Sequence, residues 1–188
     1  GAFSSSLGSM VLIKTLTASS SATLSFVHGA SSVVLDSTYP IYKFEYINIH
    51  PASVAQLTVN FRDGGTAYDA TKTTTAFNPY HNENDSTPNV IYRQAWDLAQ
   101  NTGGQIIAQE LGNGNDECCA GTLSLFNPSS ATFVKSFIAH TNTYRGEDFT
   151  ENGFLAGYVN TTTALTRVRF KMVSGNIDAG VIKMYGIK

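Results

Sequence analysis

The sequence contains few charged residues, and this shortage is its most unusual bulk property. Asp, Glu, Lys and Arg together make up 14% of the 188 residues, whereas they make up roughly 25% of an average globular protein. Ser, Thr, Asn and Gly take their place, and these residues suit water-exposed strand faces and the tight turns between strands. Helical surfaces are normally rich in Glu, Lys and Arg instead. The composition therefore favours an all-β protein.

A dense run of positive charge is also absent. The 12 Lys and Arg residues are scattered along the chain, and the formal net charge is −2. Nucleic-acid binding depends on clustered cations that neutralise phosphates. We therefore expect no nucleic-acid partner.

Long apolar segments are missing as well. No stretch approaches the roughly 18 consecutive apolar residues of a membrane-spanning helix, and the first six residues lack the basic start and apolar run of a signal peptide. We therefore expect no membrane insertion. The only cysteines, Cys118 and Cys119, are adjacent, and a disulfide between neighbouring residues is strained. Free thiols fit synthesis in a reducing cytoplasm.

Recognisable catalytic motifs are not found either. The four histidines form no H-E-x-x-H pair, and the sequence has no G-x-S-x-G elbow, phosphate-binding glycine loop or dinucleotide fingerprint. Glu110, Asp116 and Glu117 are candidates for a glycosidase pair, but the sequence does not place two of them across a cleft. We expect a non-enzymatic protein without cofactors, with a carbohydrate-active enzyme as a minor alternative.

What the sequence does contain is a period of two in its apolar residues, which is the pattern of β-strands. The clearest strand is 167–172, where Val168, Phe170 and Met172 alternate with cationic residues. In residues 133–140 both alternating sets contain apolar side chains, which predicts a central strand. Residues 57–61, followed by the turn Asp63-Gly64-Gly65 and by 72–77, predict a hairpin.

The spacing of these segments defines the expected fold. About eight strands with turn residues every 8 to 15 positions predict a single antiparallel β-sandwich, jelly-roll-like. At most one short helix is expected, near 90–100, where Ile91, Ala95 and Leu98 share a helical side. We expect residues 17–188 to form this domain. Residues 1–16 are predicted to be a flexible N-terminal arm, in which Phe3 and Leu7 contact a neighbouring molecule.

Two polar loops contain the oxygen-bearing side chains that calcium prefers. Glu83, Asp85 and Asp116 are weak calcium candidates on this basis. Neither loop has the EF-hand spacing, and Asn and Asp are also the usual residues of tight turns. Turn formation is therefore the favoured interpretation, and we expect no bound metal.

Aromatic residues in or near the loops are candidates for binding. Tyr80, Trp96 and Tyr144 occupy such positions, and aromatic rings there stack on sugars or form protein interfaces. Burial in the core is the alternative for each of them.

A set of short motifs resembles the virion structural proteins of marine tailed phages, including phages of cyanobacteria and of related ocean bacteria. The resemblance covers most of the chain from about Met10 onward and departs at Cys118-Cys119, where small polar residues are expected. The motifs are Asn48-Ile49-His50-Pro51, Leu98-Ala99-Gln100-Asn101-Thr102-Gly103, Gly112-Asn113 through Asp116, Leu125-Phe126-Asn127-Pro128-Ser129-Ser130 through Phe133-Val134-Lys135, Ala156-Gly157-Tyr158, Asn160-Thr161-Thr162, Ser174-Gly175-Asn176-Ile177-Asp178-Ala179-Gly180 and Lys183-Met184-Tyr185-Gly186.

The resemblance implies a structural role in the virion and no catalytic residue. We therefore expect a particle-surface protein, made in the host cytoplasm, that decorates or cements the head or belongs to the tail or a fibre. Its expected partners are symmetric copies of itself and other virion proteins. The alternative is a receptor-binding module that recognises a host-surface glycan or protein through its loops.

Overall fold

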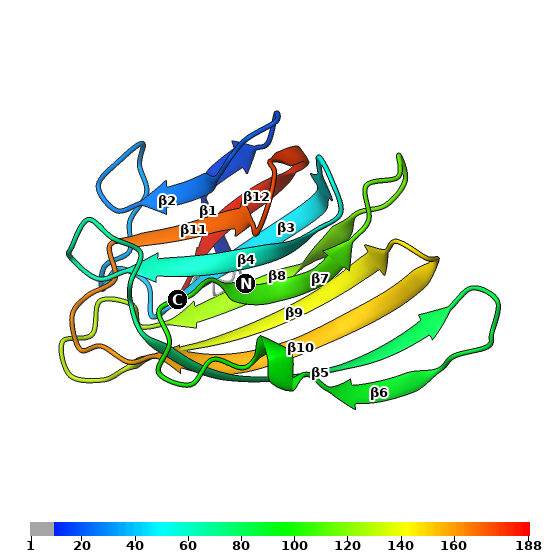
Figure 1. The fold of residues 1–188 in the computed structure, drawn as a ribbon. Helices are drawn as coiled ribbons and strands as arrows, with labels where there is room; N and C mark the ends of the chain where they lie inside the picture. Colours follow the sequence, from blue (N-terminus) through cyan, green and yellow to red (C-terminus); the bar gives the residue numbers. More distant parts are fainter. Residues whose placement is uncertain (1–9) are drawn as a thin grey trace, which may run out of the picture.

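The computed structural model describes residues 10–188 and shows an all-β protein (Figure 1). Among these residues there is no α-helix, and the only helical element is the single 3-10 turn η1 (Gln94–Trp96). The strands are β1 (Met10–Thr17), β2 (Leu24–Val27), β3 (Ile41–Pro51), β4 (Ala55–Arg62), β5 (Lys72–Asn82), β6 (Asn89–Tyr92), β7 (Gln105–Leu111), β8 (Cys119–Phe126), β9 (Lys135–Arg145), β10 (Phe149–Val159), β11 (Arg167–Met172) and β12 (Ile177–Ile187).

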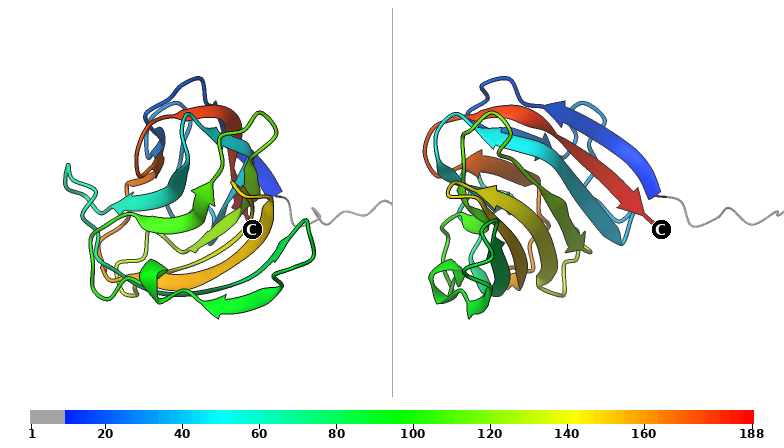
Figure 2. Two further views of the ribbon diagram at one scale, coloured as in Figure 1. Left: turned by 45° about the vertical axis from the view of Figure 1, so that its right-hand side comes forward. Right: turned by 90° about the vertical axis from the view of Figure 1, so that its right-hand side faces the viewer.

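Backbone pairing joins the twelve strands into one antiparallel sheet that is nearly closed into a barrel (Figure 2). The longest path of paired neighbours runs β1-β12-β3-β8-β9-β7-β4-β11-β2. β9 is a branch point, because it also pairs with β10 over its whole length, and β10 is followed by β5 and β6. β9 and β7 are connected only by the pair of Leu111 with Arg145.

The remaining gap lies between β1 and β2, the two ends of this path. In the short link between them, residues 18–23, the first part runs along the start of β12. Its backbone amides at Ala18 and Ser21 donate to the carbonyls of Gly180 and Ile177 at 2.8 and 2.7 Å. The link therefore holds one end of the gap together.

The period of two seen in the sequence places one face of each strand in the core. In β11, Val168, Phe170 and Met172 are at most 1% exposed. The ring of Phe170 packs on Phe44 from β3 at 5.7 Å and on Phe26 from β2 at 6.4 Å. Burial of such large apolar side chains is the main source of stability in a small domain.

A buried lysine ties together two loops at one end of the sheet. The ammonium of Lys135 donates to the backbone carbonyls of Ser130, Phe133 and Thr161 at 2.6, 3.1 and 2.9 Å. Burial lowers the pKa of this lysine. Lys135 thus links the β8–β9 loop to the β10–β11 loop through backbone contacts that no sequence motif reveals.

The all-β class is confirmed, whereas the number of strands was wrong, because the structure has twelve instead of about eight. The additional strands include β6, which is short and mostly exposed, and β7. The division into two sheets of a sandwich is not confirmed, because pairing joins all the strands. Alternation along a strand identifies its buried face but not the strands that lie beside it.

The predicted hairpin was also wrong. β4 pairs with β7 and β11, while β5 pairs with β10 and β6. Residues 63–71, which contain the turn Asp63-Gly64-Gly65, are a long connection that carries the chain to another part of the sheet. A glycine-rich turn is thus compatible with a crossover as well as with a hairpin.

The predicted N-terminal arm and the predicted short helix both differ from the structure within the described residues. Residues 10–16 of the predicted arm lie in β1, which pairs with β12, while Phe3 and Leu7 lie outside the described residues. Near 90–100, the chain forms β6 and then η1, so helical structure there is limited to one 3-10 turn.

Candidate functional site

The outward side of β5, β9 and β10 is the most distinctive surface of the domain. β9 has paired neighbours on both edges, as predicted for a central strand, but its outward side chains are not covered. Ile138 is 54% exposed and Phe77 of β5 is 47% exposed. We call this surface the outer aromatic face and define it by Thr75, Phe77, Ile138, His140 and Phe154.

Three rings form a stack across this face. Strand register places Phe154 between Phe77 and His140. The ring centroids of Phe77 and Phe154 are 5.0 Å apart with 9° between their planes, and those of Phe154 and His140 are 4.4 Å apart with 17°. His140 Nε2 lies 2.6 Å from Asn152 Oδ1, which fixes the imidazole in the stack.

The outer aromatic face contains a row of three adjoining hollows. The apolar hollow, of about 370 Å³, surrounds Phe77 and Phe154. The next, of about 480 Å³, shares His140 with it and is lined by Thr122, Asn142 and Asn152. The third, of about 350 Å³, shares Asn142 and Thr150 with the second. The surface therefore changes from apolar to polar along the strands.

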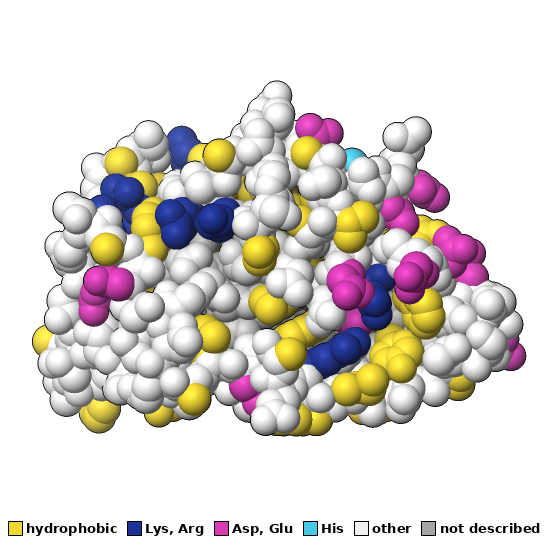
Figure 3. All heavy atoms as spheres, in the orientation of Figure 1, with side chains coloured by type: hydrophobic (Ala, Val, Ile, Leu, Met, Phe, Trp, Pro, Cys, Tyr) yellow, Lys and Arg dark blue, Asp and Glu magenta, His cyan; other side chains and the backbone are white. Residues whose placement is uncertain are grey.

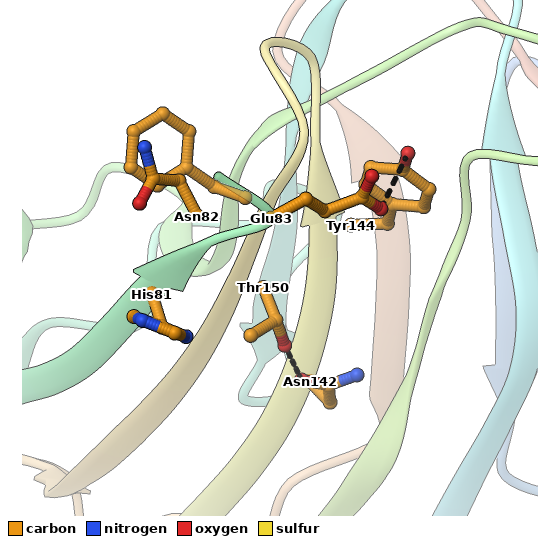
Figure 4. Close-up of a pocket in the computed structure, with 7 residues that line it drawn as sticks. His81, Asn82, Glu83, Asn142, Tyr144 and Thr150 are labelled. Carbon is orange, nitrogen blue, oxygen red and sulfur yellow. Dashed lines mark hydrogen bonds between the residues drawn. The ribbon is translucent and has the colours of Figure 1, made fainter. Parts of the chain in front are cut away.

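Figure 4 shows the third hollow, at the end of β5, β9 and β10. The hydroxyl of Tyr144 lies between two carboxylates and is hydrogen-bonded to Glu83 Oε1 at 3.3 Å and to Asp148 Oδ1 at 3.2 Å. Desolvation and these negative neighbours raise the pKa of Tyr144 to about 12. Thr150 Oγ1 donates to Asn142 Oδ1 at 2.9 Å. The hollow thus has a neutral phenol, amides, a hydroxyl and the Glu83 carboxylate on its walls.

Stacked rings bordered by amides and hydroxyls, with little charge, can bind in two ways. Sugars present apolar ring faces and many hydroxyls, which suit aromatic rings and amide groups. Protein interfaces are likewise enriched in aromatic side chains and depleted in charge at their centres. The outer aromatic face is therefore equipped for recognition.

The three aromatic residues that were predicted to bind a sugar or a protein lie in different environments. Tyr144 lines the third hollow. Tyr80 is half-buried and packs edge-on against Phe149, with the centroids 5.8 Å apart. Trp96 is only 2% exposed, and its indole N–H donates to Gln109. Trp96 is thus a core residue, and its ring is not available at the surface.

The three calcium candidates do not come together as one site. Glu83 and Asp85 lie in the β5–β6 loop, where Asp85 bonds His81 Nε2 at 2.9 Å. Asp116 lies in the β7–β8 loop, in a different hollow that contains His50. Within residues 10–188, no group of three or more His, Cys, Asp or Glu side chains is placed to hold a metal ion.

A buried network of charges, which no sequence motif indicates, is centred on Glu151 of β10. The Glu151 side chain is 1% exposed and accepts from Arg93 Nη2 at 2.8 Å. Arg145 Nη1 lies 3.5 Å from the same oxygen, and Arg145 also pairs with Glu110. Burial raises the pKa of Glu151, although the two arginines oppose this effect. The sequence alone could not reveal this network of charges, because its four residues come from four separate segments of the chain.

The edge strand β1 is a second surface of interest. Met10, Val11 and Leu12 are 45%, 37% and 52% exposed. Within the described residues β1 pairs only with β12, so its other edge offers unpaired backbone groups. Unpaired strand edges with apolar side chains are templates for contact with another chain. We call residues 10–12 the β1 edge.

No protein-family model, no curated protein and no solved structure matches the chain. In the described part of the chain, no helix is both long and apolar enough to cross a membrane. The geometry of the surfaces and the resemblance noted from the sequence are therefore the basis for assigning a function.

Proposed function

We propose that this protein is a non-enzymatic structural protein of a tailed-phage virion. It is displayed on the particle surface, as a head decoration or cement protein or as a tail or fibre component, and it assembles as symmetric copies with other virion proteins. The observation that carries the proposal is the β1 edge, where three consecutive apolar residues are exposed beside unpaired backbone. The assignment to phages rests on the sequence resemblance.

Ion pairs support a structural rather than a catalytic role for Glu110 and the buried Glu151. Glu110 and Glu151 are both bound to Arg145. An acid or base in catalysis has to exchange its proton with a substrate. Carboxylates held by arginine are instead suited to fixing the positions of strands.

The jelly-roll-like arrangement is part of this proposal. Phe61 of β4 packs on Phe137 of β9 at 5.2 Å, and Phe170 of β11 packs on Phe44 of β3 at 5.7 Å. These contacts across the core support two layers that face each other within the nearly closed sheet.

The β1 edge is tested by placing a charge on it. Leu12→Lys adds an ammonium to the exposed edge, and lysine on an edge strand blocks pairing with other chains. Val54→Lys is the matched control, because Val54 is 54% exposed and Leu12 is 52% exposed. We expect Leu12→Lys to lower incorporation into purified particles by at least about tenfold, with Val54→Lys incorporated normally. Equal incorporation of the two variants would contradict the proposal.

Residues 1–9 of the predicted arm, which include Phe3 and Leu7, precede the β1 edge in the chain. We propose that it binds a neighbouring virion protein. Deletion of residues 1–9 then abolishes incorporation while leaving the β-domain folded. Full incorporation of the truncated protein would overturn the role of the arm.

The outer aromatic face favours a second candidate function, binding of a host-surface glycan or protein. Phe154→Ser removes the central ring of the stack. Phe133→Ser is the control, because Phe133 is 69% exposed but lies in the β8–β9 loop. We expect only Phe154→Ser to lose signal on a glycan array or on host cells. Absence of wild-type binding in both assays would reject this candidate.

A further inference from the structure

Four cations gather on the outward side of β4 and β11. Arg167, Arg169 and Lys171 alternate with the buried residues of β11, and Arg62 of β4 is the direct cross-strand partner of Arg167. Figure 3 shows the resulting band of Lys and Arg over β11. We call these four residues the cationic face.

The positive charges of this face have no counter-charge within the described residues. None of the four cations has a carboxylate within ion-pair distance, although Asp63 follows Arg62 in the chain. Like charges placed directly opposite each other across strands are destabilising. A bound anion therefore stabilises the cationic face by reducing the repulsion between its charges.

The guanidinium groups are held in place but are not fully bonded. The ring of Tyr68 lies 3.6 Å from the guanidinium carbon of Arg169 and 5.9 Å from that of Arg167. The Nε atoms of both arginines are buried and have no hydrogen-bond acceptor among the described residues. A hollow of about 250 Å³ lies between Arg169, Lys171 and Asn60. The contact with Tyr68 therefore orients both guanidinium groups on the cationic face.

Six acids gather in three loops elsewhere on the molecule. The β5–β6 and β9–β10 connections touch, because the Glu83 amide donates to the Asp148 carbonyl at 3.0 Å. The β7–β8 loop joins them through Tyr144, whose amide donates to the Cys118 carbonyl at 3.0 Å. We call these loops the acidic end, with Glu83, Asp85, Asp116, Glu117, Glu147 and Asp148.

The cationic face is separate from the acidic end and extends away from it along β11. Arg62 is the last residue of β4, whereas Ala55, the first, pairs with Leu111, directly before the β7–β8 loop. At about 3.3 Å per residue, Arg62 lies roughly 23 Å from Ala55 along β4, and Lys171, opposite Thr58, lies roughly 10 Å from it. Figure 1 shows the three connections together at one end, and in Figure 3 most of the Asp and Glu side chains gather there.

We propose that the cationic face of one copy binds the acidic end of a second copy. The contact is head-to-tail, so it generates rings or open chains instead of a closed two-fold dimer. The proposal rests on the proposed assembly of copies and adds the surfaces that meet. A second copy is favoured over a free polyanion because the chain itself carries six acids at one end and a net charge of −2.

Two charge-reversed variants test the contact in solution. Arg167→Glu/Arg169→Glu disables the cationic face and keeps the acidic end. Glu83→Lys/Asp116→Lys does the opposite. Both substituted acids are exposed and neither has a positive φ. The control Lys183→Glu/Lys188→Glu changes the net charge as the first variant does, but at residues of the C-terminal segment away from β11.

Sedimentation is measured at about 50 mM and about 500 mM salt, since screening weakens exposed charge pairs. We expect wild type and the control to associate at low salt and to dissociate at high salt. Each charge-reversed variant alone associates at least about tenfold more weakly. An equimolar mixture of the two associates again, because the intact acidic end of the first variant meets the intact cationic face of the second, and the two reversed surfaces are also of opposite charge. Arg167→Gln/Arg169→Gln, which removes charge without reversing it, gives the same loss.

The proposal is overturned if wild type stays monomeric at low salt, if either variant associates like wild type, or if the mixture forms no complex. Binding of the sulfated polysaccharide heparin to the cationic face without self-association also overturns it, and assigns that face to an anionic polymer. The comparison of Leu12→Lys with Val54→Lys in particles does not involve the cationic face. It therefore decides the proposed function separately.

Discussion

Phe77 of β5 and Phe154 of β10 lie face to face on the outside of the sheet, with their centroids 5.0 Å apart and 9° between the planes. An aromatic pair of this kind normally lies in a core, where burial of the rings stabilises the fold. Here Phe77 is 47% exposed. The pair is therefore available for recognition and contributes less to stability than the buried rings do.

The first prediction compares an outer ring with an inner one. Phe154→Ala should lower the free energy of unfolding by about 1 kcal/mol, because the ring is only partly buried. Phe137→Ala should lower it by about 3–5 kcal/mol, because Phe137 is fully buried against Phe61. Urea unfolding of both variants measures the difference. Equal losses would place the two rings in equivalent environments and contradict the outward orientation of Phe154.

The second prediction concerns the buried network around Glu151. Glu151→Ala leaves Arg93 and Arg145 without their shared carboxylate, and breaking a buried ion pair costs about 3–5 kcal/mol. Glu151→Gln should cost clearly less, since the amide oxygen still accepts a hydrogen bond from Arg93 and the side chain keeps its volume. Guanidinium unfolding curves of the two variants provide the comparison. The network is not structural if Glu151→Ala is as stable as wild type.

The third prediction concerns the lysine that ties two loops. Lys135→Met keeps the apolar stem but leaves three backbone carbonyls without their donor. A lost hydrogen bond to a charged group costs about 1.5–3 kcal/mol, so the variant should unfold at lower temperature and exchange the amides of residues 127–134 and 160–166 faster. Lys188→Met, at an exposed position, is the control. Unchanged exchange in both loops would contradict this role.

The fourth prediction is a pH dependence that involves Lys72. Its ammonium is buried and donates to the carbonyl of Ala70 at 2.8 Å, and burial lowers the pKa of Lys72 to about 8 from 10.5. Between these values the unfolded chain binds the proton more often than the folded one, so stability rises with pH. Below about pH 8 the lysine is charged in both states and its burial opposes folding.

Wild type should therefore gain stability relative to Lys72→Met as pH rises from about 8 to about 10.5. Comparison with the variant cancels the titration of other groups. Denaturant unfolding at pH 7 and pH 10 provides the measurement. A constant difference between the two proteins would show that Lys72 has the same pKa in both states.

The sequence allowed prediction of the buried face of many strands but not of their neighbours. In β11, alternation located Val168 and Phe170 in the core, because side-chain direction depends only on the local backbone. The hairpin predicted around Asp63-Gly64-Gly65 failed, because a turn motif does not determine which strand pairs next. Pairing such as that of β4 with β11 joins residues more than 100 positions apart, which no local pattern specifies.

The candidate site was predictable only in part. Tyr144 was found because aromatic residues near loops often line hollows, whereas Trp96 proved to be buried. The stack of Phe77, Phe154 and His140 was missed because its members lie on three strands and become neighbours only through register. The outward exposure of β9 was missed as well, since apolar residues on both sides of a strand usually indicate burial on both sides.

The most direct test of the proposed function is to measure the protein in purified particles of a phage that encodes it. Quantitative mass spectrometry of gradient-purified particles gives the copy number, and electron microscopy of a labelled chain gives the position. We expect many copies per particle, exposed on the surface and arranged with the symmetry of the head or tail. Purified particles that lack the protein, although infected cells contain it, would contradict the proposal.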